Sequence, residues 1–185
     1  FSRRIFRTGV SFEILLEEMG EVGGLLHGMH ASEGGAGNIT VMCELPGFSP
    51  EEHGLVEKTI PLPLDVPELA GRRLLVTGSG CRLRDLAKRP LRNLGVVEVL
   101  PGGRDGRVYY LEEGRFRAPT TEYNTHLRLI QREVRLNGSR FFAVLHAQPL
   151  YLTYLTHIPA YQETMALNRA LYRWQAEQIV FYPYG

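Results

Sequence analysis

The chain opens with a helical pattern that changes abruptly into a strand pattern, and this change limits the folds available to it. From about Ser11 to His30 apolar residues recur every three or four positions, which is typical of an amphipathic α-helix. The pattern stops at Gly34-Gly35-Ala36-Gly37, a cluster that helices do not tolerate. Residues 38–43 then read as a strand. The chain therefore begins with a helix that leads through glycines into a strand.

The same alternation continues along the chain. Further strands are predicted at residues 59–62, 74–77, 95–100, 108–111, 141–145 and 179–181. Further helices are predicted at residues 83–89, 120–137, 150–157 and 161–175. Thr120 or Thr121 is expected to cap the second long helix, and Asn137-Gly138 to end it. Because helices and strands interleave without repeats, we expect an α/β fold with a mixed central sheet covered on both faces.

Bulk properties narrow the class of protein further. The length of 185 residues predicts one domain spanning residues 1–185. A formal charge of +1 gives no sign of a nucleic-acid or membrane surface, and no apolar run approaches the ~20 residues that span a bilayer. Cys43 and Cys81 are too few for a disulfide scaffold, so we expect a cytoplasmic protein. Since the chain starts at Phe1 and stops at Gly185, we expect the initiator Met and a C-terminal segment to be missing.

Two glycine-rich segments beside strands could bind phosphate. Residues 34–38 precede one strand, and residues 77–80 follow another. Glycine lets backbone N–H groups approach an anion closely, and a hydroxyl adds a donor. For either segment alone, a turn that only reverses the chain is the better interpretation. Neither matches a Walker or dinucleotide-binding pattern, which disfavours nucleotide binding.

A few polar residues beside these elements could carry chemistry. Glu122 at the start of a helix is either a carboxylate stabilised by the helix dipole or a general acid/base, and for an isolated glutamate the first interpretation is favoured. His126, one turn later, is more typical of a structural histidine. His146 and Gln148 end the strand at 141–145 and are two residues apart, so both are expected on one face. Most strand-end histidines are not metal ligands.

Four motifs, taken in order, are more specific than any of them alone. They are residues 34–40 (GGAGNIT), 75–80 (LVTGSG), 118–122 (APTTE) and 145–149 (LHAQP). Their order and spacing resemble the class II, zinc-dependent sugar-phosphate aldolases, and in particular the L-rhamnulose-1-phosphate aldolase branch. Residues 84–87 and 93–97 add to this likeness, which runs from about Leu15 to Gly185.

The resemblance implies a three-layer α/β/α fold and a homotetramer with sites between subunits. The charge balance predicts no nucleic-acid or membrane partner. The implied reaction is reversible cleavage of a deoxyketose 1-phosphate into dihydroxyacetone phosphate and L-lactaldehyde, with Zn²⁺ as a Lewis acid. By position, Glu122 corresponds to the carboxylate that moves the proton and His146 to the first zinc ligand. The positions that correspond to the phosphate-binding loops are Gly37, Asn38, Thr77, Ser79 and Gly80.

The chain departs from the family at one ligand position. Gln148 stands where the family has its second zinc-binding histidine, and the third histidine lies in a C-terminal part that this chain lacks. A catalytic zinc usually has three protein ligands, so we expect weak zinc binding or none. Three interpretations remain open: a piece of a working enzyme with Gln148 as an altered ligand, a non-catalytic sugar-phosphate-binding homologue, or a related dehydratase or epimerase.

Overall fold

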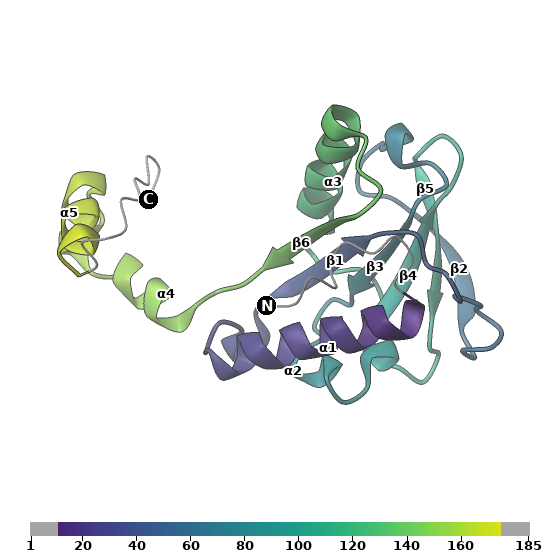
Figure 1. Cartoon of the computed structure of the whole chain (residues 1–185), viewed down its shortest axis with the longest axis horizontal. Coiled ribbons are helices and arrows are strands. Elements are labelled where there is room, and N and C mark those ends of the chain that lie inside the picture. Colours follow the sequence, from purple (N-terminus) through teal and green to yellow (C-terminus); the bar gives the residue numbers. More distant parts are fainter. Residues whose placement is uncertain (1–10, 175–185) are drawn as a thin grey trace. The chain divides into compact units, whose positions relative to one another are not determined.

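The computed structural model describes residues 11–174, which fall into two compact units (Figure 1). The first unit ends at Ala147 and the second begins at Gln148. The described part of the first unit holds helices α1 to α3 and strands β1 to β6, and that of the second holds α4 and α5. The predicted strand at 179–181 lies outside the described residues, and the single domain over residues 1–185 stays a prediction.

Six strands form one sheet in the order β2-β5-β4-β3-β1-β6. Their bounds are β1 (Asn38–Met42), β2 (Val56–Pro61), β3 (Arg73–Thr77), β4 (Leu94–Val99), β5 (Asp105–Tyr110) and β6 (Phe142–His146). The predicted α/β class is confirmed, but every neighbouring pair of these strands is antiparallel, so the sheet is not mixed. Strand direction depends on the connections. A short hairpin joins β4 to β5, whereas a parallel neighbour would need a long crossover.

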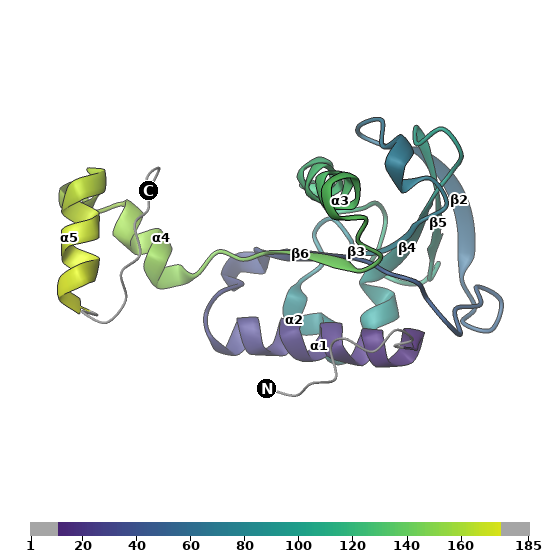
Figure 2. The ribbon, with the colours of Figure 1, turned by 45° about the horizontal axis from the view of Figure 1, so that its top comes forward.

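Helices cover both faces of this sheet. Helices α1 (Phe12–Gly28) and α2 (Leu83–Leu86) lie on one face and α3 (Tyr123–Asn137) lies on the other (Figures 1 and 2). Alternate residues of β1 point to the two layers: Ile39 packs in the cluster with α1, and Met42 packs in the cluster with α3. The first unit therefore has the three layers, α/β/α, that the sequence predicts. Short 3-10 turns occur at η1 (Glu33–Gly35), η2 (Pro67–Leu69) and η3 (Pro90–Arg92).

The start of α3 differs from the prediction. Glu122 occupies the N-cap position and no side chain caps the helix, so the expected caps at Thr120 and Thr121 are wrong. The backbone N–H of Thr120 donates to the carbonyl of Thr77 at 2.9 Å. This bond holds Thr120 at the end of β3, and the helix begins only at Tyr123. The helix ends as predicted, at Gly138 in the left-handed conformation (φ 63°).

Strand β6 is less buried than the sequence indicates. It is the outermost of the described strands on its side of the sheet and pairs there with β1 alone. Phe141 and Leu145 are 47% and 45% exposed, so the apolar run at 141–145 does not form a buried strand. An apolar run marks a strand but does not show whether that strand lies inside the sheet or at its edge.

The described part of the second unit is helical. It contains α4 (Leu150–Thr156), the 3-10 turn η4 (Pro159–Tyr161) and α5 (Thr164–Trp174). These elements match the helices predicted at 150–157 and 161–175. Of the helices in residues 11–174, none is long and apolar enough to cross a membrane.

Candidate active site

The predicted site residues of the first unit gather at one end of the sheet. The register pairs Asn38 with His146 and Thr40 with Val76, so the start of β1 lies beside the ends of β3 and β6. The loop after β3 pairs in turn with the segment before α3 through a bridge between Gly78 and Pro119. Both glycine-rich segments, the start of α3 and the end of β6 therefore share this end of the sheet.

Three side chains meet there on the face covered by α3. The amide Nδ2 of Asn38 donates to Oε2 of Glu122 at 3.3 Å and lies 3.4 Å from Nδ1 of His146. The same Glu122 oxygen is in direct contact with Nδ1 of His146, and the contact is an ion pair when that ring is protonated. Asn38 is buried, while the side chains of His146 and Glu122 are 30% and 41% exposed. A buried amide thus donates to a carboxylate and lies against an imidazole, and solvent, and hence a small molecule, can reach both of these groups.

These contacts assign a tautomer to His146. An ionised carboxylate only accepts hydrogen bonds, so the imidazole hydrogen belongs on Nδ1, facing Glu122. In the neutral ring the lone pair then lies on Nε2, which is free to accept a proton or to bind a metal. Carboxylates orient metal-binding histidines in this way, and the same arrangement suits general acid/base catalysis.

The glycines of the predicted phosphate loops differ in how much space a side chain would have at each position. Gly37 has φ +93°, and a Cβ there would lie 2.8 Å from Cδ1 of Leu83 and 3.1 Å from the carbonyl oxygen of His146. Gly80 has φ +73° with open space around it. Ser79 is exposed, and its backbone N–H donates to the carbonyl of Ala118 at 2.9 Å. Gly37 is thus required by close packing, whereas residues 79 and 80 form an exposed turn.

The hydroxyl of Thr77 has a partner within the sheet. It accepts from the N–H of Ile39 at 3.1 Å and lies 3.3 Å from the Ile39 carbonyl oxygen, to which it can donate. Thr77 is 1% exposed. The hydroxyl therefore joins β1 to β3 just beyond their last paired residues, and a role for Thr77 in binding phosphate stays a prediction.

A buried polar pair lies next to the three side chains and was missed by the sequence analysis. Nδ1 of His126 lies 2.8 Å from the hydroxyl of Thr40, and both residues are almost fully buried. Burial lowers the pKa of His126; the charge of Glu122 opposes this effect and His146 adds to it. The sequence does contain a sign of this pair, because Asn38 and Thr40 are polar residues two apart in an otherwise apolar strand.

The described residues do not by themselves fit a zinc site. His146 and Glu122 supply one imidazole and one carboxylate, and residues 11–174 contain no group of three His, Cys, Asp or Glu side chains that could hold a metal ion. A catalytic zinc normally has three protein ligands. Strand β6 ends at His146 and Gln148 begins the second unit, so the expected shared face for these two residues stays a prediction.

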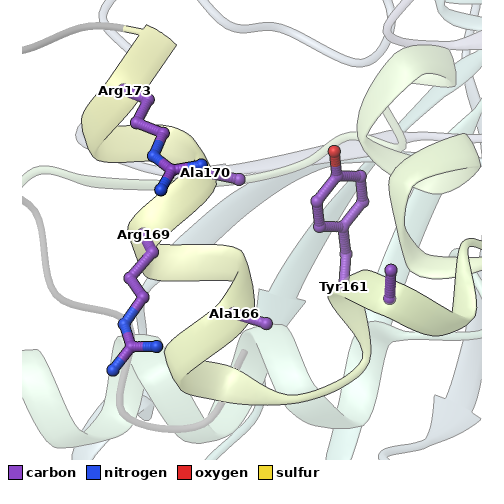
Figure 3. Close-up of a pocket in the computed structure, with 6 residues that line it drawn as sticks. Tyr161, Ala166, Arg169, Ala170 and Arg173 are labelled. Atoms are coloured by element: carbon purple, nitrogen blue, oxygen red, sulfur yellow. The ribbon is translucent and has the colours of Figure 1, made fainter.

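The second unit contains a separate cavity of about 320 Å³. Figure 3 shows Arg169 and Arg173 extending from α5, with the ring of Tyr161 rising from η4. Three alanines, at positions 160, 166 and 170, complete its lining. None of the predicted site residues lines this cavity.

Comparisons with known proteins show which proteins the chain is similar to. No protein-family model matches the chain. It is 27% identical over 175 residues to a rhamnulose-1-phosphate aldolase of Listeria monocytogenes, covering 93% of this chain and 62% of the relative. It is 28% identical over 157 residues to the protein of that name from Klebsiella pneumoniae, covering 83% of this chain and 55% of the relative.

A solved structure shows the same relationship. The crystal structure of a sugar-phosphate aldolase from Thermotoga maritima matches with a TM-score of 0.64 and 26% identity, covering 92% of this chain and 67% of the other. The predicted resemblance to sugar-phosphate aldolases, including the rhamnulose-1-phosphate branch, is confirmed. The chain spans only 55% to 62% of the length of the two curated relatives described above.

Proposed function

We propose that this chain is part of an aldolase that cleaves a deoxyketose 1-phosphate, with L-rhamnulose 1-phosphate as its substrate. The observation that carries the proposal is the meeting of Glu122, His146 and Asn38 at the end of the sheet where both glycine-rich segments lie. The names of the relatives support the sugar-phosphate substrate. Dihydroxyacetone phosphate and L-lactaldehyde would be the products.

The residues suit the proton transfers that this reaction needs. A base removes the proton of the C4 hydroxyl, the C3–C4 bond breaks to release the aldehyde, and its electron pair passes into an enediolate. A proton then returns to C3 to give dihydroxyacetone phosphate. Glu122 is the proposed proton carrier, because its carboxylate is partly exposed and is oriented by Asn38 and His146. The exposed turn at Ser79 and Gly80 and the glycine at position 37, just before β1 at the same end of the sheet, are the proposed phosphate site.

Zinc is the metal that the resemblance implies, and when bound it would stabilise the enediolate as a Lewis acid. His146 is the proposed first ligand and Gln148 occupies the position of the second. Since the described residues do not complete a zinc site, further ligands would be needed. A homotetramer and a cytoplasmic location are proposed on the same resemblance.

The decisive test is release of dihydroxyacetone phosphate from L-rhamnulose 1-phosphate by the full-length protein. Glu122→Gln should lower kcat by about 10²–10⁴-fold, as expected for loss of a general acid/base. Glu112→Gln, at an exposed glutamate, is the matched control and should leave kcat unchanged. Zinc content should be measured on the same samples. No turnover by the zinc-supplemented protein, with Gln148→His restoring none, contradicts the proposal.

A second candidate is a sugar-phosphate-binding protein without catalysis. Gln148 at a ligand position favours it, because a neutral amide oxygen suits zinc poorly. Titration calorimetry separates the two functions. Binding of L-rhamnulose 1-phosphate without turnover supports the second, and turnover excludes it.

A further inference from the structure

His126 lies one helical turn behind the proposed proton carrier. Its backbone N–H donates to the carbonyl oxygen of Glu122 at 3.1 Å, and its side chain is only 1% exposed, on the face of α3 that packs against the sheet. The position is surrounded along the helix by the apolar residues Tyr123, Leu127 and Ile130. An imidazole in such surroundings costs desolvation free energy that an apolar side chain would avoid.

One hydrogen bond orients this ring. Nδ1 lies 2.8 Å from the hydroxyl of Thr40, and Nε2 has no hydrogen-bond partner among the described residues. Thr40 is fully buried on β1, two residues after Asn38 and therefore on the same face of the strand. Both partners of the bond lie close to a site residue. His126 is one helical turn after Glu122, and Thr40 is two residues after Asn38 on the same face of β1.

We propose that His126 is a positioning residue, which fixes Glu122 relative to Asn38 and His146 by tying the first turn of α3 to β1. The Asn38–Glu122 bond spans the same two elements at 3.3 Å, but its carboxylate partner is partly exposed and competes with water. The buried His126–Thr40 bond is shielded from that competition. It therefore holds the backbone from which Glu122 projects.

The positioning role of His126 depends on a polar group at the position of Nδ1, whereas a role in packing alone would depend only on the size and shape of the side chain. Leucine at position 126 would fill similar space but would leave the Thr40 hydroxyl without its imidazole partner. Asparagine is smaller, but its side-chain amide places a polar atom where Nδ1 lies, so it can keep the bond. Thr40→Val removes the bond from the other side with little change in shape.

The test uses the full-length protein in the aldolase assay, and so rests on the proposed function. His126→Leu and Thr40→Val should each lower kcat about 10–100-fold with little change in KM, as expected when an orienting partner is lost. The double variant should be no worse than the single ones, and His126→Asn should regain most of the lost kcat. Ile130→Val, on the same buried face, is the matched control for packing, and thermal unfolding is followed for every variant.

A second readout does not depend on activity. Nitrogen-15 NMR of the imidazoles reports which ring nitrogen of His146 carries the hydrogen. The wild type should show Nδ1–H, and His126→Leu should show a mixture of tautomers, while Ile130→Val matches the wild type. An unchanged His146 spectrum in His126→Leu overturns the positioning role, as does a loss of kcat in His126→Asn equal to that in His126→Leu. Absence of turnover in the wild type overturns the proposed function alone, because the NMR comparison still decides the role of His126.

Discussion

Asn38 lies directly opposite His146 in the antiparallel register of β1 and β6, and its Nδ2 lies 3.4 Å from Nδ1 of that histidine. The same Nδ2 donates to Oε2 of Glu122 at 3.3 Å. A single buried amide thus orients the helix-borne carboxylate by a hydrogen bond and packs against the strand-borne imidazole. Because its two partners come from different layers, Asn38 links the sheet to α3 at the site.

Replacing this amide should impair the site more than the fold. Asn38→Ala removes the donor to Glu122 and should lower kcat about 10-fold or more, because the carboxylate is no longer oriented. Asn38→Asp should be worse than Asn38→Ala, since it places a carboxylate against Glu122. Steady-state kinetics with thermal unfolding of both variants tests this order. Equal kcat in the two variants would show that charge at position 38 does not act on Glu122.

Gly37 should not tolerate a side chain. Gly37→Ala combines a left-handed backbone (φ +93°) with a Cβ 2.8 Å from Cδ1 of Leu83, and should cost about 1–3 kcal/mol of unfolding free energy. Gly34→Ala is the control, because Gly34 also has positive φ (+64°) but nothing lies within 4 Å of its added Cβ. Urea unfolding should show a larger loss at 37 than at 34. Equal losses would leave backbone strain as the whole cause.

Stability should fall in mild acid because of His126. Burial lowers its pKa in the folded protein, so the unfolded chain, whose histidine has a pKa near about 6.5, binds the proton more readily. This contribution is absent well above pH ~6.5 and destabilises increasingly as pH falls from there toward the folded-state pKa, by at most about 1.4 kcal/mol per pH unit. The charge of Glu122 weakens the effect and that of His146 strengthens it.

The measurement is the difference in unfolding free energy between the wild type and His126→Leu as a function of pH. Carboxylates and other histidines titrate in both proteins and largely cancel. Between pH 7.5 and pH 5.5 the unfolding free energy of the wild type should fall relative to that of His126→Leu. A constant difference would mean that His126 titrates alike in both states.

Thr77 should contribute to stability through its hydroxyl. Thr77→Val leaves the buried N–H of Ile39 without its partner and should cost about 1–3 kcal/mol, whereas Thr77→Ser keeps the hydroxyl and should cost less. Chemical unfolding of both variants gives the comparison. An increase in KM for the sugar phosphate in Thr77→Val without loss of stability would instead favour direct phosphate binding by Thr77.

The sequence predicted the order of the helices and strands better than it predicted how the strands are arranged in the sheet. Glu122 and His146 were identified because their motifs and spacing match a known family, and the order of helices and strands followed from apolar periodicity. The direction of the strands and the edge position of β6 did not follow, because both depend on connections and neighbours rather than on local pattern.

The contact between His126 and Thr40 was also beyond local reasoning. The two residues are 86 positions apart, and their meeting requires the register of the sheet and the placement of α3 across it. Once the fold is known, the polar residues on one face of β1 explain it. The register also shows that the Thr77 hydroxyl lies within hydrogen-bonding reach of Ile39, which a phosphate-loop motif alone would not indicate.

The outermost place of β6 predicts that the site can open by local separation of this strand. Among the described strands β6 is paired with β1 alone, so its separation breaks one strand pairing and removes only Phe142 and Val144 from the packing around α3. Such an event carries His146 away from Glu122, which remains on α3. Amide protons of β6 should then exchange with solvent faster than those of Leu75 and Val97 in central strands. The site would come apart and reform many times within the lifetime of the folded protein.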